Sequence, residues 1–130
     1  MSFADYLENK ILDHIVGKTA YTMPTVYVGL STADPLDDAS GLAEPVGNAY
    51  ARVATAGTDW NAAAAGSIDN ANVITFPQAT GSWGTVTHFA LFDALTAGNM
   101  IASGALTASK AIGNGDTADF AANQLTITLD

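Results

Sequence analysis

The sequence predicts a mainly β fold: an antiparallel two-sheet β-sandwich of about seven or eight strands, preceded by one N-terminal amphipathic helix. Two observations support this prediction. Short alternating or β-branched runs recur along the chain, separated by turn-forming Gly, Pro, Asn and Asp residues. Helical periodicity is confined to the first residues. Because 130 residues make one domain, we expect a helix over residues 1–17 and one β-sandwich domain over residues 18–130.

Residues 2–17 carry the pattern of an amphipathic helix. Its apolar stripe repeats every four residues and consists of Phe3, Leu7, Ile11 and Ile15. Ser2 is a candidate N-cap with Asp5 three residues later, a weak capping box, and Gly17 suits the position after the helix end. Such a helix either covers an open edge or end of a sheet or docks on another subunit. The four stripe residues are therefore interface candidates.

Two strands and a long loop are predicted next. Residues 25–30 form a β-branched and aromatic run typical of a buried strand, and residues 48–55 alternate as a second strand would. Residues 31–47 between them have a loop composition and exceed the usual length of a connection, which makes Asp34 and Leu36 interface candidates. The aspartates lack the spacing of a calcium loop, so whether this loop binds a cation or a partner stays open.

The middle of the chain is predicted to be less regular. Residues 56–72 are interpreted as loop or a single turn, because the four alanines at 62–65 are too few to nucleate a helix alone. Trp60, in this segment, is interpreted as a plug in the core or in a subunit interface and is a further interface candidate. Residues 73–77 form a short strand that ends at a proline.

The stretch WGTVTHFALFD, residues 83–93, is predicted to be the central strand. From Val86 onward the side chains alternate, and both faces carry large apolar groups. A strand of this kind is covered on each side by other parts of the protein. The pair before it, Trp83 and Gly84, is interpreted as a bend with an aromatic plug.

The remaining third of the sequence contains further strands and turns. Residues 93–99 form a hairpin connection to a strand over 100–107, where Gly104 and three alanines suggest close packing or a bulge. Residues 110–112 are a short extended segment, followed by a Gly-Asn-Gly-Asp turn. A last strand over 125–129 is predicted to place its leucines and isoleucine inward.

The charge balance excludes several classes of partner. Thirteen Asp and Glu oppose four Lys and Arg, for a net charge of −9. Binding to phosphate backbones requires clustered cations, so no nucleic-acid partner and no anionic membrane surface is expected. The absence of cysteine excludes disulfides and thiol chemistry. No apolar run approaches the ~20 residues that span a bilayer, and no secretion signal opens the chain, so synthesis in a cytoplasm is expected.

No pattern in the sequence predicts catalysis or a metal site. The two histidines, His14 and His88, are far apart and belong to no metal-ligand motif. His88 is interpreted as a core or interface histidine. A Ser nucleophile elbow is absent, and the glycines near residue 114 do not precede a helix that could hold a phosphate. We therefore predict no catalytic residue, no metal and no cofactor.

Short phrases spread over the chain carry a resemblance. They are residues 27–32 (YVGLST), 50–53 (YARV), 74–77 (ITFP), 83–88 (WGTVTH), 92–93 (FD), 115–117 (GDT) and the closing LTITLD. In this order and spacing they resemble short tailed-bacteriophage virion proteins labelled tail fibre or minor tail proteins. The resemblance covers nearly the whole chain from residue 25 and, more loosely, the opening helix. It implies a β-rich virion subunit, made in the host bacterial cytoplasm, with no enzymatic role.

Two function hypotheses follow. The first is a non-enzymatic structural protein of the virion, tail-associated or head-decorating, whose partners are other virion proteins. A thin, alanine-rich core gains from symmetric packing, so a homo-oligomer is expected, most plausibly a trimer. The alternative is a receptor- or carbohydrate-binding module that recognises the host surface through aromatic platforms such as Tyr50, Trp60 or Trp83.

Overall fold

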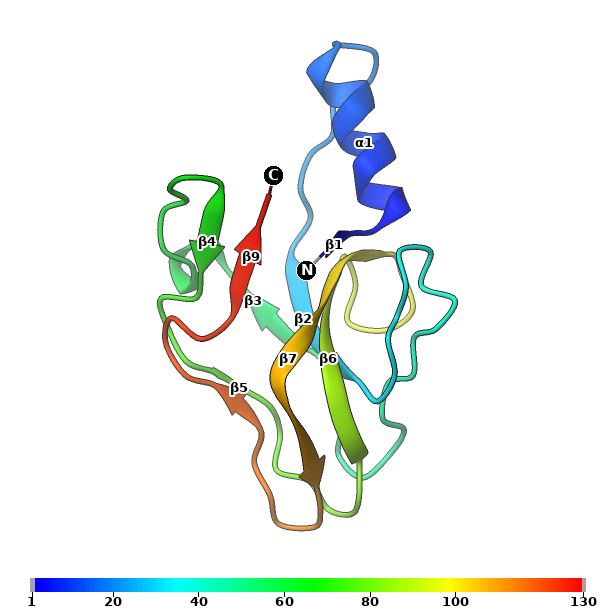
Figure 1. Ribbon diagram of the computed structural model, residues 1–130, viewed down its shortest axis with the longest axis vertical. Helices are drawn as coiled ribbons and strands as arrows, with labels where there is room; N and C mark the ends of the chain where they lie inside the picture. Colours follow the sequence, from blue (N-terminus) through cyan, green and yellow to red (C-terminus); the bar gives the residue numbers. More distant parts are fainter. Residues whose placement is uncertain (1, 130) are drawn as a thin grey trace.

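The computed structural model describes residues 2–129 (Figure 1). A five-stranded antiparallel sheet has the order β1 (Ser2–Phe3), β7 (Met100–Ile112), β6 (Gly84–Phe92), β2 (Val26–Ser31) and β3 (Val53–Thr55). Two short antiparallel ladders pair β4 (Ser67–Asp69) with β9 (Thr126–Thr128) and β5 (Ile74–Thr75) with β8 (Asp119–Phe120). The helices are α1 (Asp5–Ile15) and the 3-10 turn η1 (Gly57–Asp59). The predicted mainly β, antiparallel fold with one α-helix is confirmed. The described residues form nine strands, more than the predicted seven or eight, and these strands make one five-stranded sheet and two two-stranded ladders where two sheets were expected.

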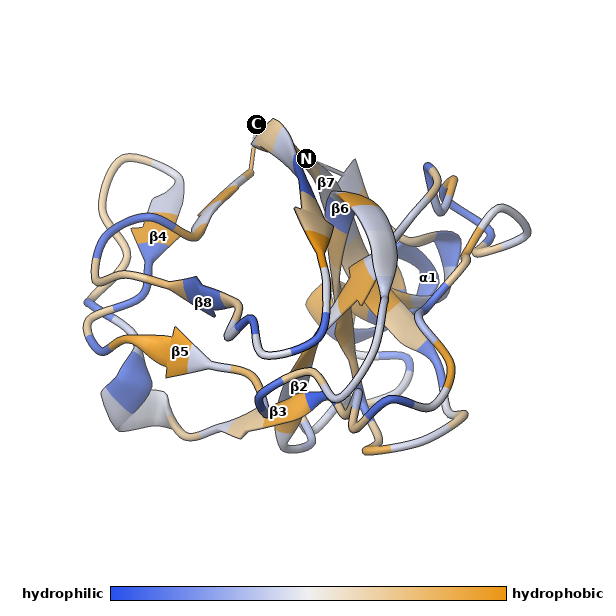
Figure 2. Ribbon diagram, turned by 90° about the horizontal axis from the view of Figure 1, so that it is seen from below, coloured by the Kyte–Doolittle hydropathy of each residue, from blue (hydrophilic) through white to orange (hydrophobic). Residues whose placement is uncertain are grey.

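The five-stranded sheet is covered on both faces. On one face lie the two short ladders (Figure 2), and the core between them joins Phe89 and Leu91 of β6 to Phe76 and Leu125. The other face, which carries Phe92, packs against part of the long loop through the loop residues Ala39 and Leu42. Strand β6 pairs with β7 on one side and β2 on the other. Its prediction as a central strand with both faces covered is therefore confirmed.

A large bulge interrupts the pairing of β6 with β7. Val86 pairs with Lys110, whereas His88 pairs with Ala105, so β7 carries extra residues between these two points. At this irregularity the alternation of side chains along β6 changes phase. Val86 therefore lies in the same core cluster as Phe89 and Leu91. The predicted alternation from Val86 onward is wrong at this point. The two segments predicted over 100–107 and 110–112 form one continuous strand, β7.

The N-terminus differs from its prediction. Ser2 and Phe3 are not helical, because they pair with Ser103 and Ala102 at the edge of β7. Helix α1 therefore begins at Asp5, and its N-cap makes no side-chain hydrogen bond, so the predicted Ser2 cap is wrong. Gly17 has a φ of 73°, as its predicted position after the helix end requires. The helix rises beyond one end of the sheet (Figure 1).

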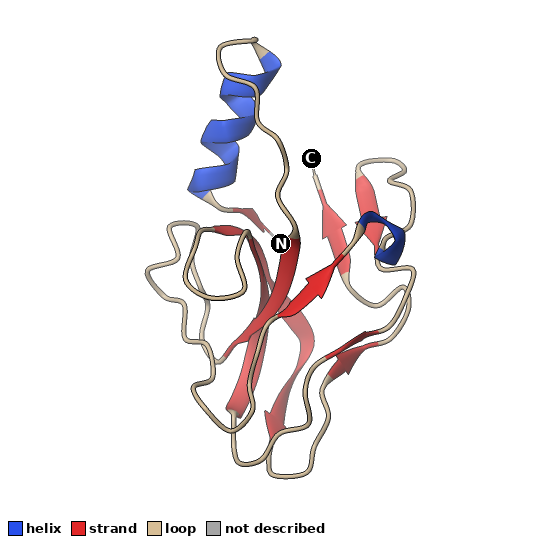
Figure 3. Ribbon diagram, turned by 180° about the vertical axis from the view of Figure 1, so that it is seen from behind, coloured by secondary structure: helices blue, strands red, loops and turns tan. Residues whose placement is uncertain are grey.

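The segment after β2 is less regular than predicted. No helix or strand lies between Thr32 and Arg52 (Figure 3), so the predicted strand over 48–55 is reduced to β3. Asn48 and Ala49 have φ values of 52° and 66°, which end any extended pairing there. Strand β4 lies in the segment predicted as loop. Leu129 was predicted to face inward and is 59% exposed.

A largely buried ion pair joins the long loop to the β6–β7 connection. The Arg52 Nε donates to Glu44 at 3.0 Å, and its Nη1 donates to the carbonyls of Ala94 and Ala97, both at 2.8 Å. The guanidinium carbon lies 3.4 Å from the centroid of the Phe92 ring. These contacts join the long loop, the β6–β7 connection and the sheet through one side chain.

Tyr50 completes this network, and its titration gives a test of it. Its hydroxyl donates to Glu44 Oε2 at 2.7 Å and accepts from the Leu30 amide at 3.0 Å. Burial, with a smaller contribution from Glu44, raises the pKa of Tyr50 far above its usual value of 10.0. The unfolded chain therefore releases this proton first as the pH rises. The stabilisation is fully present below pH 10.0 and is lost above it.

We expect the free energy of unfolding of the wild-type protein to fall as the pH rises above 10.0. The free energy of unfolding of Tyr50→Phe should fall less steeply over the same range. At neutral pH the variant should be about 1–2 kcal/mol less stable, because it loses hydrogen bonds of a buried hydroxyl. Denaturant unfolding at a series of pH values measures both effects. An equal alkaline slope in the two proteins would contradict the assignment to Tyr50.

Candidate functional site

An open apolar groove lies between α1, one end of the five-stranded sheet and the β4–β9 ladder. Its volume is about 300 Å³. Every side chain that lines it is apolar: Phe3, Leu7, Ile11, Met23, Val26, Trp60, Ile68, Leu91, Ile101, Ala102 and Ile127. Such a surface is unfavourable in water, and it suits a protein partner that can bury it.

Three local arrangements build the groove. Pairing of β1 with β7, together with a hydrogen bond from the Ala4 amide to the Ile101 carbonyl at 3.0 Å, fixes the start of α1 above the sheet. The β4–β9 register places Ile68 opposite Ile127. On the remaining side, the Trp60 indole nitrogen donates to Thr55 Oγ1 at 3.2 Å, which holds the ring against the sheet.

The structure brings together four of the interface candidates that the sequence indicated. Phe3, Leu7, Ile11 and Trp60 all line this groove. Ile15 continues the stripe of α1 beyond the groove and is 67% exposed. Three further lining residues, Met23, Ile68 and Ile127, are not among the predicted interface candidates. Only Ile127 had a usable signal, because the alternation of the last strand placed it inward.

The other two candidates, Asp34 and Leu36, lie elsewhere. They line a separate hollow with His88, on the face of the sheet opposite the groove. Asp34 Oδ1 is 3.9 Å from His88 Nε2, and His88 Nδ1 is 2.8 Å from Thr87 Oγ1. Asp34 also accepts the Leu36 amide at 3.0 Å, as a turn-forming aspartate does. Among residues 2–129 no three His, Cys, Asp or Glu side chains are grouped to hold a metal ion.

The aromatic rings considered as carbohydrate platforms are not on exposed loops. Trp83 is 4% exposed, and its indole nitrogen donates to the Asn48 carbonyl at 2.9 Å. Tyr50 packs edge-to-face against Trp83, with ring centroids 5.2 Å apart. Trp60 lies half-buried in the apolar groove. The interpretation of Trp83 as an aromatic plug is confirmed.

These observations define a class: a mainly β domain with an apolar groove suited to protein contacts. The family of phage fibre proteins described as "Podophage GP4 fiber I protein gp80" matches residues 2–128, and the chain belongs to this family. The membership supports a structural role in the virion and association with other virion proteins, as the resemblance implied. No curated protein matches the sequence. In the described part of the chain, no helix has the length and apolarity needed to cross a membrane.

Proposed function

We propose that this chain is a non-enzymatic structural subunit of a phage tail fibre that assembles through its apolar groove. The observation that carries the proposal is the uniformly apolar lining of the groove, on a protein with a net charge of −9. The fibre family favours a tail-associated position over decoration of the head. In this role the chain needs no catalytic residue and no cofactor.

The partner in the groove is a second copy of this chain. Copies with a charge of −9 repel each other, and the repulsion is least where the contact contains no carboxylate. The groove provides such a contact. The adjoining helix offers a matching apolar surface, since Leu12 and Ile15 are 59% and 67% exposed. The exposed helix end of one copy and the groove of another are chemically complementary. Among closed symmetric assemblies, we expect a trimer.

One substitution in the groove tests this assembly. Met23 lines the groove and is 51% exposed, so Met23→Asp places a charge in the contact at little cost to the fold. Light scattering should give an oligomeric mass for the wild-type protein and a mass near 13.3 kDa for Met23→Asp. Ile15→Asp should shift the mass in the same direction, because Ile15 belongs to the helix end that enters the groove.

Leu95→Asp is the matched control, since Leu95 is 52% exposed, lies in the β6–β7 connection and does not line the groove. Its mass should equal that of the wild-type protein. A wild-type protein that is a monomer at all concentrations would refute self-assembly. Equal dissociation by Met23→Asp and Leu95→Asp would show that added charge, and not the groove, controls the association.

A further inference from the structure

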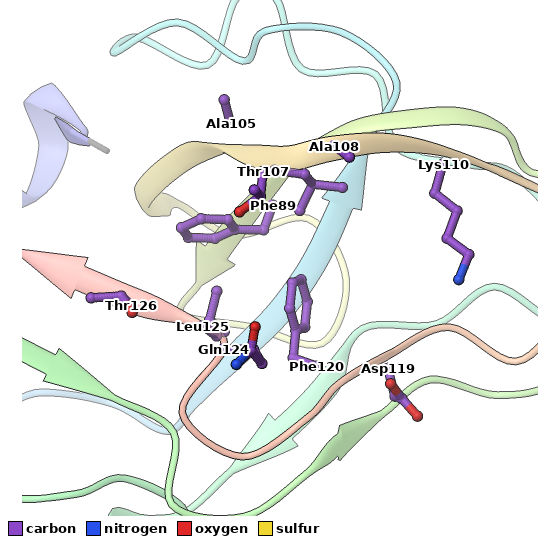
Figure 4. A pocket seen from close by; sticks show the side chains of 11 residues that line it. Phe89, Ala105, Thr107, Ala108, Lys110, Asp119, Phe120, Gln124, Leu125 and Thr126 are labelled. Atoms are coloured by element: carbon purple, nitrogen blue, oxygen red, sulfur yellow. The ribbon is translucent and has the colours of Figure 1, made fainter.

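A second hollow, of different chemistry, lies on the edge of the molecule below the groove. It is about 370 Å³ in volume, a size typical of small-ligand sites. The bulged part of β7 forms its upper wall, and the segment from β8 to β9 forms its lower wall (Figure 4). Because the bulge adds residues to β7 without pairing them to β6, this stretch of the strand is free to line the hollow.

The inner surface of this hollow is aromatic and rigid. Phe89 reaches in from the sheet and Phe120 from the opposite wall (Figure 4). Phe120 is half-buried and makes edge-to-face contacts with Phe89 and Phe76, each with ring centroids 6.3 Å apart. A ring fixed in this way loses little conformational freedom when a ligand packs on it.

Polar side chains surround the aromatic rings. They are Thr107, Lys110, Asp119, Gln124 and Thr126. None of these five side chains makes a hydrogen bond or an ion pair with another described residue, so their donors and acceptors are free for a ligand. One cation and one carboxylate make the rim neutral overall, in contrast to the acidic protein as a whole.

We propose that this hollow binds a neutral saccharide. The apolar C–H face of a sugar ring packs on an aromatic side chain, and its hydroxyl groups both donate and accept hydrogen bonds, which matches the hydroxyls and the amide of the rim. The single lysine and the net charge of −9 disfavour an anionic ligand such as a phosphate. The unpaired polar groups disfavour a purely apolar one, because they would be buried without partners. This binding role goes beyond assembly and does not depend on it.

Amide chemical shifts of the isotope-labelled full chain test the proposal. The probes are the methyl glycosides of glucose, galactose, mannose and N-acetylglucosamine, with inorganic phosphate and an uncharged peptide, N-acetyl-trialanine amide, as the competing chemistries. At least one glycoside should shift amides within 104–110 and 119–126. Phosphate and the peptide should not.

Two exposed rim residues provide variants that spare the core. Gln124→Ala and Thr107→Ala should each weaken the glycoside about tenfold, the effect of losing one good hydrogen bond. Gln78→Ala, an exposed glutamine outside the hollow, is the matched control and should bind like the wild-type protein. The proposal is overturned if none of the four glycosides shifts these amides up to its solubility limit. It is equally overturned if only phosphate or the peptide does, or if the rim variants bind as the control does.

Discussion

Replacing Asn70 by alanine should lower the free energy of unfolding by about 3–5 kcal/mol. The Asn70 side chain is fully buried and acts as a connector between distant segments. Its Oδ1 accepts the amides of Gln124 at 3.1 Å and Leu125 at 2.8 Å. Its Nδ2 donates to the carbonyls of Asn72, Phe120 and Ala121. Alanine would leave several backbone groups without partners, and at least the Leu125 amide has no access to water.

Denaturant unfolding of the wild-type protein and three variants measures this effect. Asn72→Ala is the matched control, because Asn72 is an exposed asparagine two residues away whose side chain bonds Thr58 and Asp59. It should cost less than about 1 kcal/mol. Asn70→Asp keeps the acceptor but loses the amide donor and buries a charge, so it should resemble Asn70→Ala in severity. A loss below about 1 kcal/mol for Asn70→Ala would show that the C-terminal segment is held by other contacts.

The role of Asn70 also shows where sequence reasoning ends. Nothing local marks Asn70 as different from its neighbours, because all of its partners except the Asn72 carbonyl lie fifty or more positions later. Strands β5 and β8 contain two residues each, too few to display a period of two. Their pairing depends on contacts across the chain, and the sequence indicated only the β5 segment. In contrast, β6 is long and apolar on both faces, which is why its central position could be predicted.

The apolar groove was partly predictable because some of its lining residues belong to a periodic pattern. The periodicity of residues 3–15 identified three of its lining residues, and the size and apolarity of Trp60 identified a fourth. Ile68 and Met23 had no such pattern, since they occur singly in segments without periodicity. For the bulge in β7 that lines the second hollow, Gly104 was the only signal in the sequence. Its location, between the β7 residues that pair with Val86 and His88 of β6, follows from the pairing register.

Arg52→Ala, a separate single variant, should also lower the free energy of unfolding by about 3–5 kcal/mol. The Arg52 and Glu44 side chains are 6% and 18% exposed, so removal of the guanidinium leaves a carboxylate with little water around it. It also leaves the Ala94 and Ala97 carbonyls without their donor. Lys18→Ala, which removes an exposed cation, should change stability by less than about 0.5 kcal/mol.

A double-mutant cycle separates the ion pair from the packing around it. Arg52→Met with Glu44→Gln removes both charges and keeps much of the volume, so it should recover part of the stability lost by Arg52→Met alone. Arg52→Lys keeps the charge but cannot form the bidentate contact or reach both carbonyls, so it should remain destabilised. A buried pair is poorly screened by salt, and the loss should therefore persist at high ionic strength. If salt abolished the difference between Arg52→Ala and the wild-type protein, the pair would behave as a surface contact. The two loops would then need another anchor.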